Sequence, residues 1–209
     1  MAPCLRCYSV LVIQPGPLPR AYRVIVVDLG TIKMSLVLEL ERLADAVGSG
    51  QAAAPAQISF ASVAERIAKS LAVRPDEVAI LGISNRWRHL FFIVPETLKN
   101  VGFIPLSSKS ALAARTARET SPEIINDFAS VKHASVFEGV KTTAENAELI
   151  QRIISAPIFA GDRVVGVIQI SRKGSDNRAA GPHFTADDLA KVLALCTPLG
   201  KLLQHAVAE

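Results

Sequence analysis

The chain has 209 residues, of which 50% are hydrophobic and 20% charged, enough for one ordinary domain with additional segments. Its formal net charge is +4, but residues 1–34 carry four basic residues against one acidic residue, so the remainder is nearly balanced and offers no extended phosphate-binding face. No apolar run approaches the roughly 20 residues that span a bilayer, so we expect a cytoplasmic protein with no nucleic-acid or membrane partner.

Residues 1–33 do not match the rest of the chain, and we interpret them as an unanchored N-terminal extension. Cys4 and Cys7 form a C-x-x-C pair, but no second pair completes a zinc site and no βαβ unit follows, so we interpret the pair as a chance occurrence. The run AYRVIVVDL has the composition of one strand. Because an amphipathic pattern opens at Met34, we hypothesise that translation starts there, which the intact mass of the native protein tests.

Residues 34–56 are expected to form a helix and a linker. The run SLVLELERLADAV predicts a helix over 35–47, because its apolar residues share one face: Leu36, Leu40, Leu43 and Val47. Small and flexible residues follow in GSGQAAAPAQ. A helix this short is marginal alone, so it packs either on the domain or on a twin from another chain.

A second helix is predicted from SFASVAERIAKSLAV, whose apolar residues recur at helical spacing: Phe60, Val63, Ala64, Ile67, Ala68 and Leu71. Ser59 is the expected N-cap, with Ser62 as the alternative, and Arg74-Pro75 is expected to stop the helix. The runs EVAILGIS and HLFFIVP then predict two strands around a polar turn.

The middle of the chain mixes short elements. FIPLS predicts a short extended piece, SALAARTARE a helix, and PEIINDF a third short strand. The polar run from Val131 to Ile150 has no clear periodicity, and segments of this kind often form the lid of a binding pocket.

The stretch ISAPIFAGDRVVGVIQISRKG predicts a hairpin, with arms at 153–159 and 164–170 and a turn at Gly161-Asp162. Both arms are apolar on both faces, which is typical of central strands that are covered above and below. Pro157 lacks an N–H, so it must lie at a bulge or beside an unpaired edge. Gly166 allows close approach to the backbone.

A long helix is predicted to close the chain. Thr185 and Asp188 have the spacing of a capping box, and Pro198 is expected to kink the helix. Its apolar face includes Cys196, which we therefore assign to the core: Leu189, Val192, Leu193, Cys196, Leu199 and Leu203. The order helix, hairpin, mixed middle, hairpin, helix predicts an α+β fold, in which an antiparallel sheet carries the terminal helices on one face.

The C-terminal part of the chain has a distinct order of motifs. A strand ends in Pro and an aliphatic residue, and a Gly turn and a Gly-hydrophobic strand follow. Phe and an acidic pair then precede a leucine-rich helix. The residues concerned are Pro157, Gly161, Gly166, Phe184, Asp187 and Asp188. In this order residues 57–207 resemble the GAF domain family, and we place the domain at 57–209. The resemblance implies a GAF-like six-stranded antiparallel sheet, with helices on one face and a pocket-forming lid region on the other.

The resemblance leaves the cofactor open. Family members bind cyclic nucleotides, bilins, haem or small metabolites, and many only mediate dimerisation. Covalent bilin attachment needs a pocket cysteine, and no cysteine lies between residues 8 and 195. Cyclic-nucleotide-binding members often carry an Asn-Lys pair before the Phe and the acidic pair. Here Arg172-Lys173 stands at that place, so the Asn is absent. Haem needs an axial histidine, for which four residues qualify by type alone: His89, His133, His183 and His205.

The resemblance implies a regulatory or sensory module in signal transduction, without catalytic or metal-binding residues. Arg115, Thr116, Asn126 and Asp127 are the candidate contacts to a small-molecule ligand. A homodimer through the 35–47 helix or the terminal helices is expected, with a separate output protein as partner.

Two alternatives remain. A GAF-fold enzyme such as a free methionine sulfoxide reductase uses cysteines in its pocket region, where this chain has none. The effector half of a transcription regulator needs a DNA-binding helix pair, which residues 1–56 do not supply.

Overall fold

The computed structural model describes residues 11–15, 22–26, 34–49, 59–84, 86, 88–100, 102–130 and 148–206. Its main sheet has six strands in the order β5-β4-β3-β8-β7-β6, and every neighbouring pair is antiparallel. The strands are β3 (Val78–Ser84), β4 (His89–Val94), β5 (Phe103–Pro105), β6 (Glu123–Ile125), β7 (Leu149–Ala160) and β8 (Arg163–Gly174). This arrangement confirms the predicted α+β class and the six-stranded antiparallel sheet.

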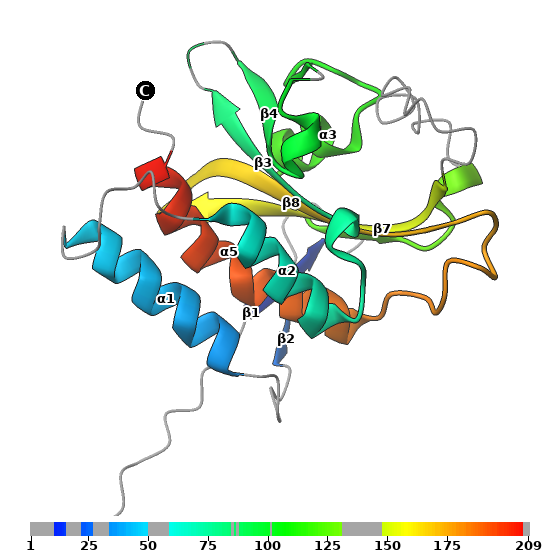
Figure 1. Cartoon of the computed structure of the whole chain (residues 1–209), viewed down its shortest axis with the longest axis horizontal. Coiled ribbons are helices and arrows are strands. Elements are labelled where there is room, and N and C mark those ends of the chain that lie inside the picture. The colour runs from blue at the N-terminus through cyan, green and yellow to red at the C-terminus, as the bar shows by residue number, and fades with distance from the viewer. Residues whose placement is uncertain are drawn as a thin grey trace, which may run out of the picture.

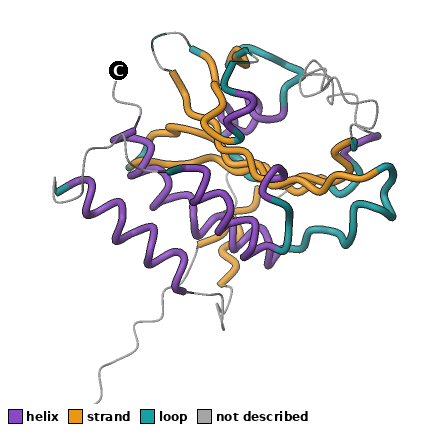
Figure 2. The backbone as a smooth tube through the Cα atoms, viewed as in Figure 1, coloured by secondary structure: helices purple, strands orange, loops and turns teal. Residues whose placement is uncertain are grey.

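Three helices lie on one side of this sheet, as Figures 1 and 2 show. They are α1 (Met34–Gly48), α2 (Phe60–Leu71) and α5 (Ala186–Ala206). Helix α1 packs on α5 as an outer layer, and its four buried residues face inward: Leu36, Leu40, Ala44 and Val47. An ion pair from Lys201 Nζ to Asp45 (3.1 Å) ties α1 to α5, and another from Arg66 to Glu39 ties it to α2. Of the apolar face predicted for 35–47, Leu36, Leu40 and Val47 are therefore covered within the chain, while Leu43 is half-buried against the same core.

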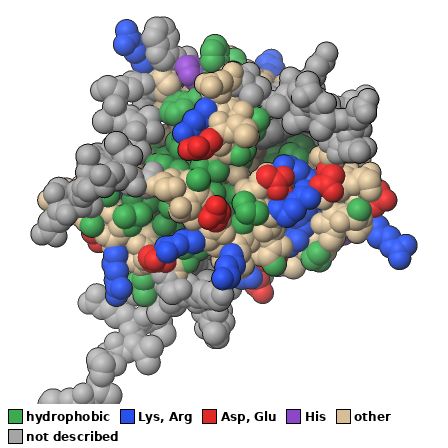
Figure 3. Space-filling model, viewed as in Figure 1, with side chains coloured by type: hydrophobic (Ala, Val, Ile, Leu, Met, Phe, Trp, Pro, Cys, Tyr) green, Lys and Arg blue, Asp and Glu red, His purple; other side chains and the backbone are tan. Residues whose placement is uncertain are grey.

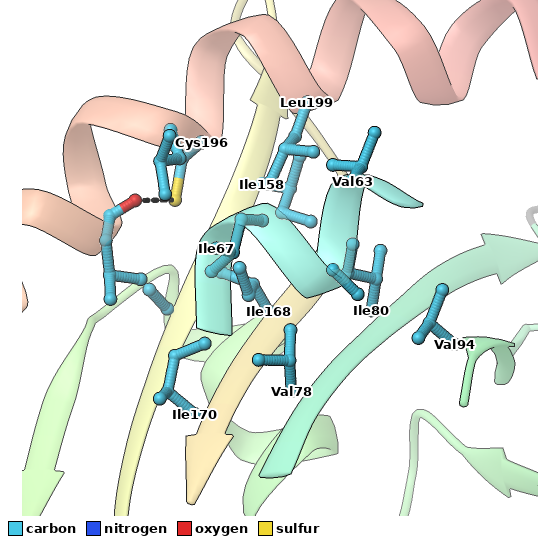
Figure 4. Packing of buried hydrophobic residues seen from close by; sticks show 14 of the residues in the cluster. Val63, Ile67, Val78, Ile80, Val94, Ile158, Ile168, Ile170, Cys196 and Leu199 are labelled. Carbon is cyan, nitrogen blue, oxygen red and sulfur yellow. Dashed lines mark hydrogen bonds between the residues drawn. The ribbon is translucent and has the colours of Figure 1, made fainter. Parts of the chain in front are cut away.

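The larger core lies between these helices and the sheet, as Figure 4 shows. Side chains alternate along a strand, so Ile168 and Ile170 of β8 point to the helices, while Val167, directly before Ile168, belongs to the cluster on the opposite face. Ile67 of α2 is fully buried in the helix-side cluster, a burial that stabilises the fold by about 1.5–3 kcal/mol.

Helix α2 begins as predicted. The Oγ of Ser59 accepts a hydrogen bond from the N–H of Ser62 (3.2 Å), which confirms Ser59 as the N-cap. The helix ends earlier than the Arg74-Pro75 stop that the sequence suggested, because Ala72 adopts a left-handed conformation (φ 52°) and its N–H returns to the carbonyl of Ala68.

The central hairpin β7–β8 is antiparallel along almost its whole length. Strand β6 pairs with β7 only from Ile153 to Ser155. The β6 edge of β7 is therefore unpaired at Pro157, where the missing N–H of proline leaves no carbonyl of β6 without a hydrogen bond. Gly166 allows the close approach to the backbone that the sequence predicts. A Cβ added there would collide with the carbonyl of Leu81 and lie 2.8 Å from Leu203 Cδ1.

The opposite face of the sheet is covered by α3 (Leu112–Glu119), which lies above it in Figure 1. Alanines of α3 pack on apolar residues of β3, β4 and β8: Ala113, Ala114 and Ala117 on Ala79, Leu81, Leu90, Phe92 and Val167. Short 3₁₀ turns connect the elements at η2 (Pro75–Glu77), η3 (Glu96–Leu98) and η4 (Phe128–Ser130). The predicted lid region thus includes α3, while residues 131–147 lie outside the described part of the chain.

The N-terminal segment contains a two-stranded antiparallel sheet of β1 (Leu11–Pro15) and β2 (Tyr22–Val26). The sequence predicted a strand in the AYRVIVVDL run but none at β1. Cys4 and Cys7, and the linker from residue 50 to residue 58, lie outside the described residues. Among the helices that the structure describes, none is both long and apolar enough to cross a membrane.

Candidate functional site

A chain of polar side chains lies buried between α3 and the sheet. Thr116 of α3, Ser155 of β7 and Gln169 of β8 are each at most 2% exposed. The hydroxyl oxygens of Thr116 and Ser155 are 2.7 Å apart, and Gln169 Nε2 donates to Ser155 Oγ at 3.2 Å. The β7–β8 register pairs Ser155 with Gln169, which places both side chains on the α3 face.

The direction of these hydrogen bonds follows from the number of protons. Thr116 Oγ1 donates its single proton to the carbonyl of Leu112 (3.0 Å), so at Ser155 it can only accept. Ser155 therefore donates to Thr116 and accepts from Gln169. The Oε1 atom of Gln169 is buried and has no hydrogen-bond partner in the described part of the molecule. Turning the amide over would leave Nε2 unpaired instead, so one strong polar atom lacks a partner in either orientation.

Most same-face neighbours of this polar chain are apolar. Val167 lies beside Gln169 on β8, and Ile153 and Pro157 lie on either side of Ser155 on β7. The other same-face neighbour of Gln169 is Ser171, whose hydroxyl donates to the carbonyl of Glu77. An unpaired amide atom among such residues costs free energy. A molecule that hydrogen-bonds to the Gln169 amide and presents an apolar body would fit this chemistry.

The four residues proposed from sequence do not converge on one point. Thr116 belongs to the buried polar chain, and Arg115 beside it points to β6, where its Nη2 donates to Glu123 Oε1 at 2.7 Å. Asn126 uses both polar atoms of its amide on the main chain of Phe184, at 2.8 and 3.0 Å. Asp127 is exposed and accepts from the Ser130 hydroxyl. Their role as ligand contacts stays a prediction.

The chain matches no family model and no curated protein. Solved structures are similar to it in fold. The GAF domain of an Acinetobacter phosphoenolpyruvate-protein phosphotransferase has a TM-score of 0.57 at 14% identity, over 87% of this chain and 99% of that one. Part of a methyl-accepting chemotaxis protein has a TM-score of 0.54 at 12% identity, over 83% and 99%.

The domain has a GAF-like fold. A free methionine-R-sulfoxide reductase from Neisseria meningitidis, solved in complex with its substrate, is also similar, with a TM-score of 0.50 at 13% identity, over 83% of this chain and 89% of that one. Identities this low establish the fold alone, because one fold hosts many functions.

Two members of the buried polar chain in this GAF-like domain were missed from sequence. The strand pattern includes Ser155 and Gln169 without assigning them a role, although each is a polar residue within an arm predicted to be buried on both faces. Such a residue needs a hydrogen-bond partner, and that requirement was the available signal. The partners themselves depend on the strand register and on the position of α3.

Cys196 is buried in the helix-side core of the GAF-like domain, and its Sγ lies 3.4 Å from the carbonyl of Val192. Burial raises the pKa of its thiol to about 12, so at neutral pH it is protonated and a poor nucleophile. No cluster of candidate metal ligands occurs among the described residues. Of the four histidines, His89 and His205 are half-buried and His183 is exposed, while His133 lies outside the described ranges.

The visible surface of the GAF-like domain carries both signs of charge. Figure 3 shows Lys and Arg side chains next to Asp and Glu on this face. Ion pairs also occur among the described residues, for example from Arg74 to Glu148 at 2.6 Å and to Glu77 at 3.4 Å. Charges that are paired in this way attract a polyanion less than a surface of one sign does.

Proposed function

We propose that the protein is a regulatory module that binds a small molecule on the α3 side of its sheet and has no catalytic activity of its own. The observation that carries the proposal is the unpaired amide atom of Gln169, which is 2% exposed and ends the hydrogen-bonded chain through Ser155 and Thr116. The fold of the phosphotransferase GAF domain and of the chemotaxis protein segment supports a sensory role.

The expected ligand is a mostly apolar molecule with at least one hydrogen-bonding group. The Gln169 amide would orient it, and the apolar residues around the polar chain would contact its body: Leu81, Phe92, Ala117 and Val167. The ion pair between Arg115 and Glu123 lies on the same side of the sheet, where it joins α3 to β6. Arg115 would therefore act on the ligand through the position of α3.

The test is a metabolite screen by thermal unfolding, preceded by native mass spectrometry of the purified protein to detect a retained molecule. A compound that raises the melting temperature of the wild type should have no effect on Gln169→Met. The matched control is Gln204→Met, because Gln204 is exposed on α5, and this variant should respond like the wild type. An equal response from Gln169→Met would contradict the proposal.

The same native mass measurement tests the proposed homodimer. Because the inward face of α1 is already packed on α5, a dimer would use the outer surface of these helices, where Leu38 is 38% exposed. A separate output protein would then receive the signal. A monomeric mass at micromolar concentration would contradict the dimer.

An enzymatic role is the second candidate, because one solved structure of this fold is a free methionine-R-sulfoxide reductase. Cys196 is the single cysteine in the described region, and its thiol pKa is about 12. This high pKa argues against thiol chemistry there. Reduction of free methionine sulfoxide should therefore not be detected. Turnover that disappears in Cys196→Ser would overturn the regulatory proposal.

A further inference from the structure

A second unpaired polar group lies on the other face of the sheet, among the helices. Arg152 of β7 is 4% exposed, and its Nε and Nη1 atoms are buried without any hydrogen-bond partner. Arginine is always charged in proteins. A buried guanidinium without a partner is strongly unfavourable, since it has lost its hydration without gaining a counter-charge.

A second arginine lies directly beside it. The β7–β8 register pairs Arg152 with Arg172, so both side chains point to the helix face from neighbouring strands. Arg172 Nη1 and Nη2 donate to the carbonyls of Ala72 and Leu71 at the end of α2, at 3.3 and 3.5 Å. Its guanidinium also lies 4.9 Å from the centre of the Phe184 ring, while its Nε is buried and unpaired.

Two like charges on paired positions repel each other, and no ion pair with a carboxylate is formed by either arginine within the described residues. The carboxylates of Glu148, Glu77 and Asp188, at this end of the sheet, bind other groups and not these two arginines. Glu148 pairs with Arg74, and Glu77 accepts from the main-chain N–H groups of Arg74 and Lys173. Asp188, in the first turn of α5, accepts from Thr185 and Lys191. A water molecule would satisfy an N–H group but would not neutralise the charge.

We propose that Arg152 and Arg172 bind a phosphate group between the sheet and the helices. A phosphate dianion matches two guanidinium charges, and its oxygens accept the paired N–H groups of the arginine fork. The Phe184 ring contacts Arg172 just before α5 begins at Ala186, which places the arginine pair beside the start of this helix. This site is on the opposite face from Gln169, so it is independent of the proposed function.

Bound phosphate would connect several elements. Arg152 and Arg172 come from β7 and β8, and Arg172 also holds the end of α2. Asn126, at the end of β6, holds the Phe184 main chain beside them. Occupancy would therefore stabilise the contact between this end of the sheet and the α2 and α5 helices, and the protein would respond to the concentration of free phosphate or of a phosphorylated metabolite.

The test measures binding of radiolabelled inorganic phosphate to the full chain by equilibrium dialysis in Tris-chloride buffer, with chloride adjusted to constant ionic strength. The wild type should bind a single phosphate per chain. Arg152→Met, which keeps the apolar length of the side chain but removes the fork, should lower the affinity at least about tenfold. The control Arg163→Gln, at an exposed position of β8, should bind like the wild type.

Competition by glycerol phosphate would identify the phosphoryl group of a larger molecule as a ligand, whereas competition by inorganic phosphate alone would identify free phosphate; both support the site. If Arg152→Met does not fold, Arg152→Lys serves instead, because it keeps the charge without the fork and should bind severalfold more weakly. The proposal is overturned if the wild type binds no phosphate in chloride, if acetate competes equally well, or if the substituted arginine leaves the affinity unchanged.

Discussion

Thr116 on α3 and Ser155 on β7 bring their hydroxyl oxygens to 2.7 Å at a place that solvent does not reach. The two residues are 39 positions apart in sequence. Their hydrogen bond is therefore a tertiary contact that fixes α3 on the sheet. It also fixes the polar chain that ends at the Gln169 amide.

Replacing Ser155 with Ala should destabilise the domain by about 1–3 kcal/mol, because Gln169 loses its acceptor and Thr116 its donor in a buried setting. In a double-mutant cycle with Thr116→Val, the two substitutions should show a coupling energy of about 0.5–3 kcal/mol. Urea unfolding measures both values. The control Ser107→Ala, at an exposed position, should change stability by less than about 0.5 kcal/mol; additive effects of the cycle would show that the contact contributes nothing.

Local patterns predicted most of the fold. The caps at Ser59 and Thr185 depend on residues three positions away, and the central hairpin depends on a turn and two apolar arms. Signals of this range are visible in a single sequence. The candidate site was only partly predicted, because Thr116 joins Ser155 and Gln169 only after α3 and two strands are in place. The pairing of Arg152 with Arg172 likewise depends on strand register, which the β-bulge between Ile150 and Arg152 shifts.

Gly200 illustrates the opposition between helix propensity and packing. In the middle of an exposed helix, Gly→Ala would stabilise by about 1 kcal/mol. Here a Cβ on Gly200 would collide with the carbonyl of Phe159, where α5 lies against β7. Gly200→Ala should therefore lower the free energy of unfolding, by about 1–3 kcal/mol.

The control for this prediction is Thr197→Ala, at an exposed position of the same helix, which should be neutral or slightly stabilising. Chemical denaturation of both variants gives the comparison. A Gly200→Ala protein as stable as the wild type would mean that α5 can move away from Phe159 without loss.

Burial of Cys196 predicts a stability change at alkaline pH. Its thiol pKa is about 12 in the folded protein, against about 8.5 in an unfolded chain. The neutral thiol is thus favoured by folding, so this contribution is complete below pH 8.5 and is lost as pH rises toward 12, at about 1.4 kcal/mol per pH unit.

The measurement uses a protein in which Cys4 and Cys7 are replaced by serine, compared with the same protein carrying Cys196→Ala. Between pH 8.5 and 10 the first should lose about 2 kcal/mol more than the second in urea unfolding. Its thiol should also react with a disulfide reagent only after unfolding. A parallel loss in both proteins, or rapid reaction of the native thiol, would contradict the buried state of Cys196.

The capping box of α5 predicts a change at acid pH. Burial opposes ionisation of Asp188, but hydrogen bonds from the N–H and hydroxyl of Thr185 and the nearby Lys191 outweigh it, so the pKa of Asp188 is lowered. A lowered pKa means that the stabilisation is complete above the unfolded value of about 3.9 and is lost as pH falls through the folded value.

Asp188→Asn should therefore cost about 0.5–2 kcal/mol at pH 7, and the difference from the wild type should shrink below pH 4. Asp187→Asn is the matched control, since Asp187 is exposed in the same turn and acts only through the helix dipole, worth about 0.3–1 kcal/mol. Urea unfolding at several pH values between 7 and 3 separates the two. If the Asp188→Asn difference did not shrink at all as the pH fell, its cause would be the lost shape of the cap and not the charge of Asp188.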